Sequence, residues 1–97
     1  MTAKIWNKNW WIDETREKVL DNTLDRLIRQ AGFNVLGTIE HEFTPFGYTK
    51  LWLLGESDLA LHTFPEENKA YVELSSCNVA YFDAFIVEMD KLFKGVG

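Results

Sequence analysis

The sequence predicts an α+β fold in which a mostly antiparallel sheet carries two helices on one face. Three observations support it: five segments have the composition or alternation of strands, two have helical periodicity, and the later strands follow one another through short turns. The resulting order is β-α-β-β-β-β-α. With 97 residues and no linker, repeat or low-complexity stretch, the chain is predicted to form one domain over residues 1–97.

The first part of the chain predicts a strand and an amphipathic helix. Residues 4–12 (KIWNKNWWI) are rich in Trp and Ile, which is typical of a strand. We expect residues 13–15 to cap the helix that follows and Gly32 to end it in the C-cap position. Between these caps, apolar residues recur with helical spacing at Val19, Leu20, Leu24, Leu27, Ile28 and Ala31.

Four further strands and a closing helix are predicted. The strands cover 33–43, 48–54, 57–64 and 70–76, and turns lie between them at Pro45–Gly47 and at 65–68. A helix over roughly 80–94 has apolar residues on one face, namely Phe82, Phe85, Ile86, Met89 and Phe93. If both helices cover one face of the sheet, the other face must meet solvent or a partner.

Composition excludes several classes of function. A net charge of −5 without a basic patch argues against nucleic acid or an anionic membrane as a partner, and no apolar run is long enough to span a membrane. The first fifteen residues do not resemble a secretory signal, and a single cysteine suits a reducing compartment. We therefore expect a soluble cytoplasmic protein. Aromatic residues make up 14% of the chain, which favours burial in a dimer interface.

Three side chains are candidates for chemistry: Ser57, His62 and Cys77. Each also has an ordinary structural explanation, as a turn hydroxyl, a hydrogen-bonded strand histidine and a small buried residue. The two histidines, His41 and His62, lack the close spacing of zinc ligands, so no metal site is predicted. A glycine-rich phosphate loop is also absent. The aromatic cluster is interpreted as core or interface; it comprises Trp6, Trp10 and Trp11.

Three collinear blocks carry a resemblance to a known family. HEFTPFGYT (41–49), LLGESDLALHTFPE (53–66) and YVELSSCN (71–78) together resemble the bacterial S-adenosylmethionine decarboxylases, which are pyruvoyl-dependent enzymes of polyamine synthesis. The match runs from about residue 27 to 78. The resemblance implies a lyase that decarboxylates S-adenosylmethionine, which supplies the aminopropyl donor for spermidine.

The resemblance implies that the cofactor is made from the chain itself. Ser57 would attack the carbonyl of Glu56, and the chain would then break between these two residues and leave a covalent pyruvoyl group at position 57. His62 and Thr49 would assist this self-cleavage, because a serine hydroxyl is a poor nucleophile at neutral pH. On a regular strand Ser57 and His62 point to opposite faces, so we expect a turn or bulge at 56–58 to bring them together.

The resemblance also implies roles in the decarboxylation. The pyruvoyl ketone would form a Schiff base with the substrate amine and accept the electrons left by CO₂. Cys77 would return a proton to the α-carbon, since a thiol is mostly protonated at neutral pH. Phe43 would stack on the adenine and Glu66 would bind the ribose hydroxyls. Members of this size form homodimers, whose two sheets are the middle layers of an α/β/β/α sandwich.

The sequence departs from the family pattern at several positions. Asp58 stands where the family usually has histidine, Asn78 replaces a glycine, Phe64 a tryptophan, and Thr49-Lys50 replaces Ser-Gly. The carboxylate of Asp58 suits the sulfonium of S-adenosylmethionine, but equally the cationic group of ornithine or arginine, or a role in processing. Two alternatives thus stay open: a pyruvoyl-dependent ornithine or arginine decarboxylase, and an unprocessed paralogue that acts as a binding or regulatory subunit.

Overall fold

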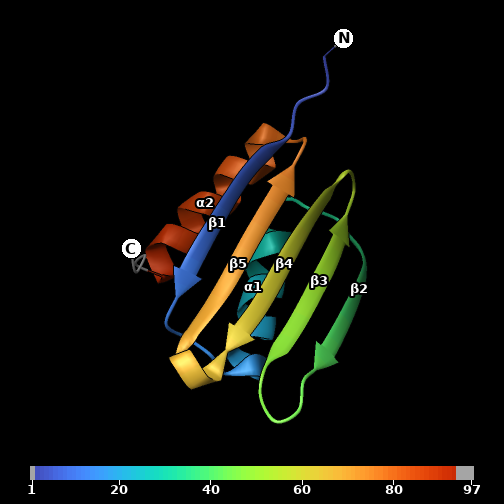
Figure 1. The fold of residues 1–97 in the computed structure, drawn as a ribbon. Coiled ribbons are helices and arrows are strands. Elements are labelled where there is room, and N and C mark those ends of the chain that lie inside the picture. The colour runs from blue at the N-terminus through green and yellow to red at the C-terminus, as the bar shows by residue number, and fades with distance from the viewer. Residues whose placement is uncertain (1, 94–97) are drawn as a thin grey trace.

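The computed structural model describes residues 2–93 and confirms the predicted order of elements (Figure 1). A 3₁₀ turn, η1, occupies the predicted turn after the fourth strand. The closing helix begins one residue before the predicted 80 and ends at Leu92, short of the predicted 94, which lies outside the described residues. The elements are β1 (Trp6–Ile12), α1 (Glu17–Gln30), β2 (Val35–Glu42), β3 (Tyr48–Leu54), β4 (Ser57–Phe64), η1 (Pro65–Glu67), β5 (Lys69–Ser76) and α2 (Val79–Leu92).

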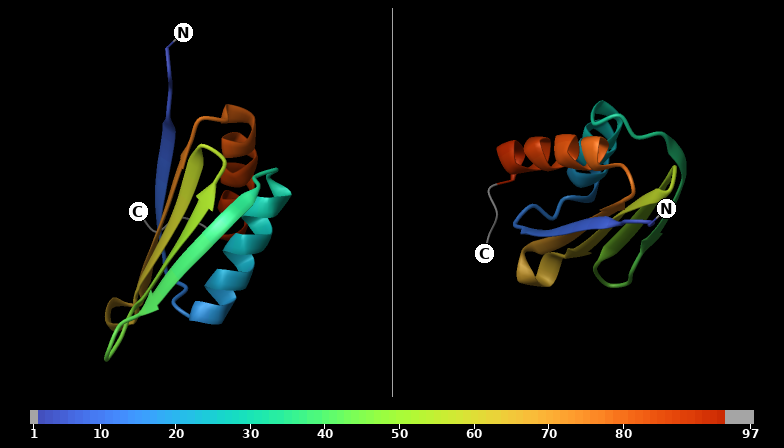
Figure 2. Two further views of the ribbon diagram at one scale, coloured as in Figure 1. Left: turned by 90° about the vertical axis from the view of Figure 1, so that its right-hand side faces the viewer. Right: turned by 90° about the horizontal axis from the view of Figure 1, so that it is seen from above.

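The five strands form one sheet in the order β1-β5-β4-β3-β2, with every neighbouring pair antiparallel. Four of the strands therefore follow as a meander, and the N-terminal strand adds to the far side of β5. Both helices lie on the same face of the sheet, and the opposite face is left uncovered (Figure 2). This confirms the predicted α+β class and the placement of the helices. The dimeric sandwich stays a prediction.

Strand alternation decides which side chains enter the core. In β4 the buried residues are every second one, and the residues between them lie on the open face of the sheet, opposite the helices. The helices contribute their apolar stripes to the same layer. The core comprises Trp10, Ile12, Leu20, Leu24, Leu27, Ile28, Ala31, Phe33, Tyr48, Trp52, Leu54, Leu59, Leu61, Ala70, Val72, Leu74, Phe82, Phe85 and Met89.

The start of α1 differs from the expectation, and its end agrees with it. The N-cap is Arg16, outside the predicted 13–15, and its side chain makes no capping hydrogen bond. Instead, the Glu14 carboxylate accepts from the backbone N–H groups of Thr15 and Arg16, at 3.0 and 2.9 Å, and from the Arg16 guanidinium. Hydrogen bonds from Arg16 lower the pKa of Glu14 to about 2. The C-cap is Ala31, and Gly32 follows it with a φ of 115°. The Gly32 N–H donates to the Arg29 carbonyl at 3.1 Å, so Gly32 ends the helix as predicted, one position beyond the C-cap.

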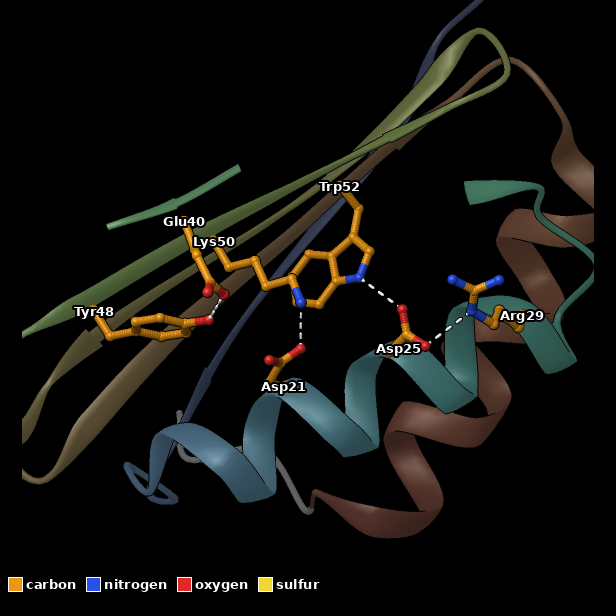
Figure 3. Close-up of polar contacts among 7 residues, drawn as sticks. All are labelled: Asp21, Asp25, Arg29, Glu40, Tyr48, Lys50 and Trp52. Atoms are coloured by element: carbon orange, nitrogen blue, oxygen red, sulfur yellow. Dashed lines mark hydrogen bonds and ion pairs between the residues drawn. The ribbon is translucent and has the colours of Figure 1, made fainter. Parts of the chain in front are cut away.

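Polar contacts tie α1 to β3 on the helix-covered face (Figure 3). The largely buried ammonium of Lys50 pairs with Asp21, and the indole N–H of Trp52 donates to Asp25 at 3.1 Å. Asp25 also accepts from Arg29 at 2.8 Å. Burial raises the pKa of Asp25, but the hydrogen bonds from Arg29 and Trp52 outweigh it and leave the pKa below its usual value. These contacts fix the inner face of the strand whose outer face carries Thr49.

The open face of the sheet exposes apolar side chains along β2 and β3. Ile39, Leu51 and Leu53 are 68%, 42% and 59% exposed. They stand side by side, because Ile39 pairs with Leu51 in the ladder. A patch of this kind on a sheet surface is typical of a contact with another protein.

No helix within residues 2–93 is long and apolar enough to cross a membrane.

Candidate active site

Most of the predicted site residues fall into two groups at opposite ends of β4. Ser57 begins the strand and His62 lies five residues further along it, which places them roughly 17 Å apart at about 3.3 Å per residue. The ladder from Ser57 to Phe64 runs without a register shift against both β3 and β5. The bulge expected at 56–58 is therefore absent from the strand, and the two side chains do not meet within one chain.

Ser57 lies on the helix-covered face, just after a two-residue turn. Leu54 and Ser57 pair across the hairpin, so Gly55 and Glu56 alone form the connection. The Ser57 side chain is buried, and its hydroxyl donates to the Ser76 hydroxyl at an oxygen–oxygen distance of 2.9 Å. The candidate nucleophile is thus held in a packed, hydrogen-bonded position and is shielded from bulk water.

The residue before Ser57 has a strained backbone. Glu56 has a φ of 57°, in the left-handed region that glycine tolerates and a residue with a Cβ avoids. Such a conformation costs about 1–2 kcal/mol, and it falls on the residue whose carbonyl the Ser57 hydroxyl would attack. A tight hairpin between two paired strands imposes it.

Cys77 lies at the same end of the sheet as Ser57. It follows Ser76 at the end of β5 and its side chain is exposed. The next residue, Asn78, is the N-cap of α2: its side-chain oxygen accepts from the Tyr81 backbone N–H at 3.0 Å. A hollow of about 220 Å³ opens beside this helix start, lined by Gly32, Phe33, Asn34, Gly55, Asn78 and Tyr81. Ser57, Ser76 and Cys77 together form what we call the serine group.

His62 and Thr49 form the second group, on the open face. They are ladder partners on β4 and β3, and the Thr49 hydroxyl lies 2.9 Å from Nδ1 of His62 in a hydrogen bond. Both line a hollow of about 410 Å³ that also takes in Phe43 and Glu66. The structure thus brings together four predicted residues, which we call the histidine group: Phe43, Thr49, His62 and Glu66.

A row of side chains extends the histidine group across the sheet. Trp11, Tyr71, His62, Thr49 and His41 are successive ladder partners on the five strands. The ring centroids of Trp11 and Tyr71 are 4.9 Å apart, and Trp11 is exposed. Of the tryptophans interpreted as core or interface, Trp10 is buried in the core, whereas Trp11 lies on the open face.

One carboxylate stands beside this row. Glu73 accepts hydrogen bonds from Asn7 at 2.8 Å and from the Tyr71 hydroxyl at 2.9 Å. These bonds, Asn7 first and then Tyr71, outweigh the effect of burial and lower the pKa of Glu73 below its usual value. Glu73 is therefore a fixed negative charge next to the histidine group, at a position that sequence reasoning did not single out.

Asp58 belongs to neither group by its contacts. It follows Ser57 in the chain but points to the open face, as strand alternation requires. There it lines an apolar hollow of about 470 Å³ whose other walls include Ile39, Leu51 and Leu53. Its carboxylate is exposed at the Ser57 end of β4, so it would meet a molecule that covers the open face. The structure does not bring Asp58 to His62.

Sequence reasoning also missed Ser76, the hydrogen-bond partner of Ser57. A signal for it exists: the hairpin turn at 65–68 fixes the pairing of Phe64 with Lys69, and counting back along both strands places Ser76 opposite Ser57. In residues 2–93, no cluster of three or more His, Cys, Asp or Glu side chains could hold a metal ion. The groups present are suited to acyl transfer and proton transfer.

Comparison with known proteins finds relatives for most of the chain. Residues 13–95 match the model of the family described as S-adenosylmethionine decarboxylase. A protein of Prochlorococcus marinus (strain MIT 9313), named S-adenosylmethionine decarboxylase proenzyme, is 41% identical over 61 residues, which are 63% of this chain and 49% of that protein. An S-adenosylmethionine decarboxylase proenzyme 2 of Bacillus cereus (strain ATCC 14579) is 45% identical over 47 residues, covering 48% of this chain and 38% of that protein.

A solved structure is similar in fold. The crystal structure of the adenosylmethionine decarboxylase from Aquifex aeolicus superposes with a TM-score of 0.70, covering 93% of this chain and 83% of that one. The sequence identity is 18%, so this likeness shows the fold alone. The chain spans about half the length of the curated relatives that it matches.

Proposed function

Because this chain belongs to the S-adenosylmethionine decarboxylase family, we propose that it is a self-processing, pyruvoyl-dependent decarboxylase of S-adenosylmethionine. Proteins of this family carry a pyruvoyl group that self-cleavage makes from a serine. The observation that carries the proposal is the state of Ser57: a buried, hydrogen-bonded hydroxyl directly after a residue with a strained backbone. A cytoplasmic location fits the single cysteine.

The residues around position 57 fit a group made in place. The hydroxyl and the Glu56 carbonyl belong to adjacent residues, so the attack needs no diffusing partner. The left-handed backbone of Glu56 supports the acyl shift, because breaking the peptide bond there releases the constraint of the turn. Once formed, the pyruvoyl group supplies a ketone that holds the substrate amine and accepts the electrons left by CO₂.

The remaining residues divide the work between processing, binding and proton transfer. Cys77, exposed at the same end as Ser57, is proposed to return the proton to the α-carbon. The Thr49–His62 hydrogen bond orients the imidazole, which is proposed to assist processing through its other nitrogen. In the same hollow, Phe43 is 51% exposed and available to stack on adenine, and Glu66 can accept hydrogen bonds from ribose hydroxyls.

A homodimer would bring the two groups together. Within one chain the serine and histidine groups are at opposite ends of β4, but two sheets packed through their open faces with strands reversed would place the end that carries the Glu56–Ser57 peptide over the His62 end of the partner's sheet. The exposed patch of Ile39, Leu51 and Leu53 supports such a contact. Cleavage also frees residue 57 from the turn that now directs it to the helix side. The proposal is therefore a site completed by a second copy.

One alternative substrate class is favoured by a specific observation. Asp58 presents its carboxylate on the open face at the Ser57 end of the sheet, in a position where it could bind any cationic group. The sulfonium of S-adenosylmethionine is one such group, and the ammonium of ornithine or the guanidinium of arginine is another. The pyruvoyl chemistry is the same in both cases.

The first experiment is the intact mass of the purified protein, with Ser57→Ala as control. We expect two fragments, 1–56 and a pyruvoyl-blocked 57–97, from the wild-type chain, and one full-length mass from Ser57→Ala. CO₂ release is then measured with S-adenosylmethionine, ornithine and arginine. We expect release from S-adenosylmethionine alone. A full-length mass that persists after long incubation would overturn the proposal in favour of an unprocessed binding or regulatory subunit.

A further inference from the structure

We propose that Ser76 orients the Ser57 hydroxyl for self-cleavage, a role that rests on the proposed function. Its oxygen is the one side-chain partner that the described structure gives to the candidate nucleophile, at 2.9 Å. Ser76 is fully buried and Ser57 is nearly so. The two residues are ladder partners on neighbouring strands, so their separation is fixed by the sheet and does not depend on a mobile loop.

The hydrogen-bond inventory of Ser76 fixes the direction of the contact. A serine hydroxyl has one hydrogen to donate and two lone pairs to accept. The Ser76 oxygen accepts from the Asn78 backbone N–H at 2.9 Å, and its own hydrogen points to the Asn78 carbonyl at 3.3 Å. One lone pair remains on the Ser76 oxygen, so Ser57 must be the donor in the contact between them. The Ser57 hydrogen therefore points to Ser76, and the lone pairs on the Ser57 oxygen are free to form the bond to the Glu56 carbonyl carbon.

Ser76 is itself held in place by the start of α2. Both of its other contacts are to the backbone of Asn78, and the Asn78 side chain caps the helix by accepting from the Tyr81 N–H at 3.0 Å. The rotamer of Ser76 is therefore set by a helix terminus rather than by solvent. This is the kind of support that keeps a reacting group within the narrow range of geometry that acyl transfer needs.

The first covalent step needs such a partner. The Ser57 oxygen forms an ester bond to the carbonyl carbon of Glu56, the peptide bond from that carbon to the nitrogen of residue 57 breaks, and the hydroxyl hydrogen ends on that nitrogen. The step consumes and releases nothing. As the new bond forms, the O–H bond weakens, and an acceptor already aligned with it stabilises the developing positive charge on the oxygen. Ser76 occupies that position.

The chain supplies a matched control in the neighbouring residue. Ser75 precedes Ser76 on β5, carries the same hydroxyl and points to the open face, where it accepts from the Asn7 amide at 2.6 Å. Its removal tests the loss of a serine hydroxyl from the same strand without touching Ser57. A second matched pair is Ser76→Thr and Ser76→Val, which have nearly the same shape and differ in the hydroxyl.

The test is the rate of self-cleavage by intact mass in freshly purified chains, with thermal unfolding confirming that each variant is folded. We expect Ser76→Ala to slow cleavage by about 10- to 100-fold, Ser76→Thr to stay within a few fold of wild type, and Ser76→Val to behave as Ser76→Ala. Ser75→Ala should cleave at the wild-type rate. Equal rates for the Thr and Val variants would overturn the role of Ser76, even if the Ala variant failed to fold.

Hydroxylamine separates the acyl shift from the steps that follow it, because it cleaves esters. If Ser76 serves the acyl shift, the slow Ser76→Ala chain holds no ester and hydroxylamine leaves it intact. Rapid cleavage at residue 56 on adding hydroxylamine would contradict the proposal, since the ester would then have formed without Ser76. A wild-type chain that never cleaves would instead overturn the proposed function, so the two failures are distinguishable.

Discussion

The two candidate residues of β4, Ser57 at its start and His62 near its other end, point to opposite faces of the sheet. At the start, Ser57 faces the helices, is buried and is held by Ser76 after a strained turn. Near the other end, His62 faces away from the helices, into an open hollow shared with Thr49. Residues close in sequence therefore need not share a site: an odd separation on a regular strand places them on opposite faces, and five residues place them far apart.

The largest expected effect comes from separating the serine and histidine groups onto different chains. Neither Ser57→Ala nor His62→Ala should cleave when expressed alone. When the two are co-expressed, the His62→Ala chain should be cleaved, because the end of its sheet that carries the intact Glu56–Ser57 peptide faces the intact His62 of a partner copy. Intact mass distinguishes the two chains and their fragments.

The matched control for this mixing experiment replaces the Ser57→Ala chain, which supplies the intact His62. A Ser57→Ala/His62→Ala double variant, co-expressed with His62→Ala, should leave every chain whole, since no intact imidazole is then present. Cleavage of the His62→Ala chain by itself, or its persistence at full length in the first mixture, would contradict a site shared between two copies.

The next effect separates stability from chemistry on β3, where Thr49 and Lys50 point to opposite faces. Asp21→Asn should lower the free energy of unfolding by about 2 kcal/mol, because it leaves the largely buried charge of Lys50 unpaired. The partial exposure of Asp21 keeps the loss below the 3–5 kcal/mol of a fully buried pair. Thr49→Val should cost less than about 1 kcal/mol but prevent self-cleavage. Urea titration in a Ser57→Ala background measures the stabilities.

A smaller effect is expected from relaxing the turn before Ser57. Glu56→Gly should raise the free energy of unfolding by about 1 kcal/mol, since glycine adopts a φ of 57° without the Cβ penalty. If the strain helps the acyl shift, the same change slows self-cleavage. Glu56→Ala keeps the strain and loses only the carboxylate, so it should match the wild type in both measurements. A Gly variant that is neither more stable nor slower would show that the turn stores no useful strain.

The smallest effect concerns the start of α1, which contributes no residue to either group. The folded pKa of Glu14, about 2, lies below its usual value, so its hydrogen bonds stabilise the fold above about pH 4.5 and the contribution is lost as the pH falls towards 2. Glu14→Gln should remove that part of the pH dependence, on the order of 1 kcal/mol after solvent screening. Urea titrations at pH 6 and pH 3 in a Ser57→Ala background test this. If the free energy of unfolding changes between these pH values by the same amount with and without Glu14→Gln, the prediction is refuted.

Much of the fold was predictable from local pattern. The spacing of Leu20, Leu24, Leu27 and Ile28 predicts α1 and its buried face, and all four are buried. Alternation predicts β3 and β4 with their bounds as observed. The prediction was wrong at the start of α1, where the Glu14 carboxylate accepts from the N–H groups of Thr15 and Arg16 and the helix begins only after Arg16. Charged side chains of this length reach the backbone in ways that a cap rule does not cover.

Periodicity and the order of side chains along the chain were enough to predict the class of fold, the family blocks and the residues that carry the proposed chemistry. How those residues are distributed over the sheet depends on the packing of the whole chain. Continuous pairing through β4 keeps Ser57 and His62 apart, and the register of β5 gives Ser57 a partner in Ser76. The physical reason is that alternation is local, whereas register and the choice of covered face are set by strands and helices packed together across the whole sheet.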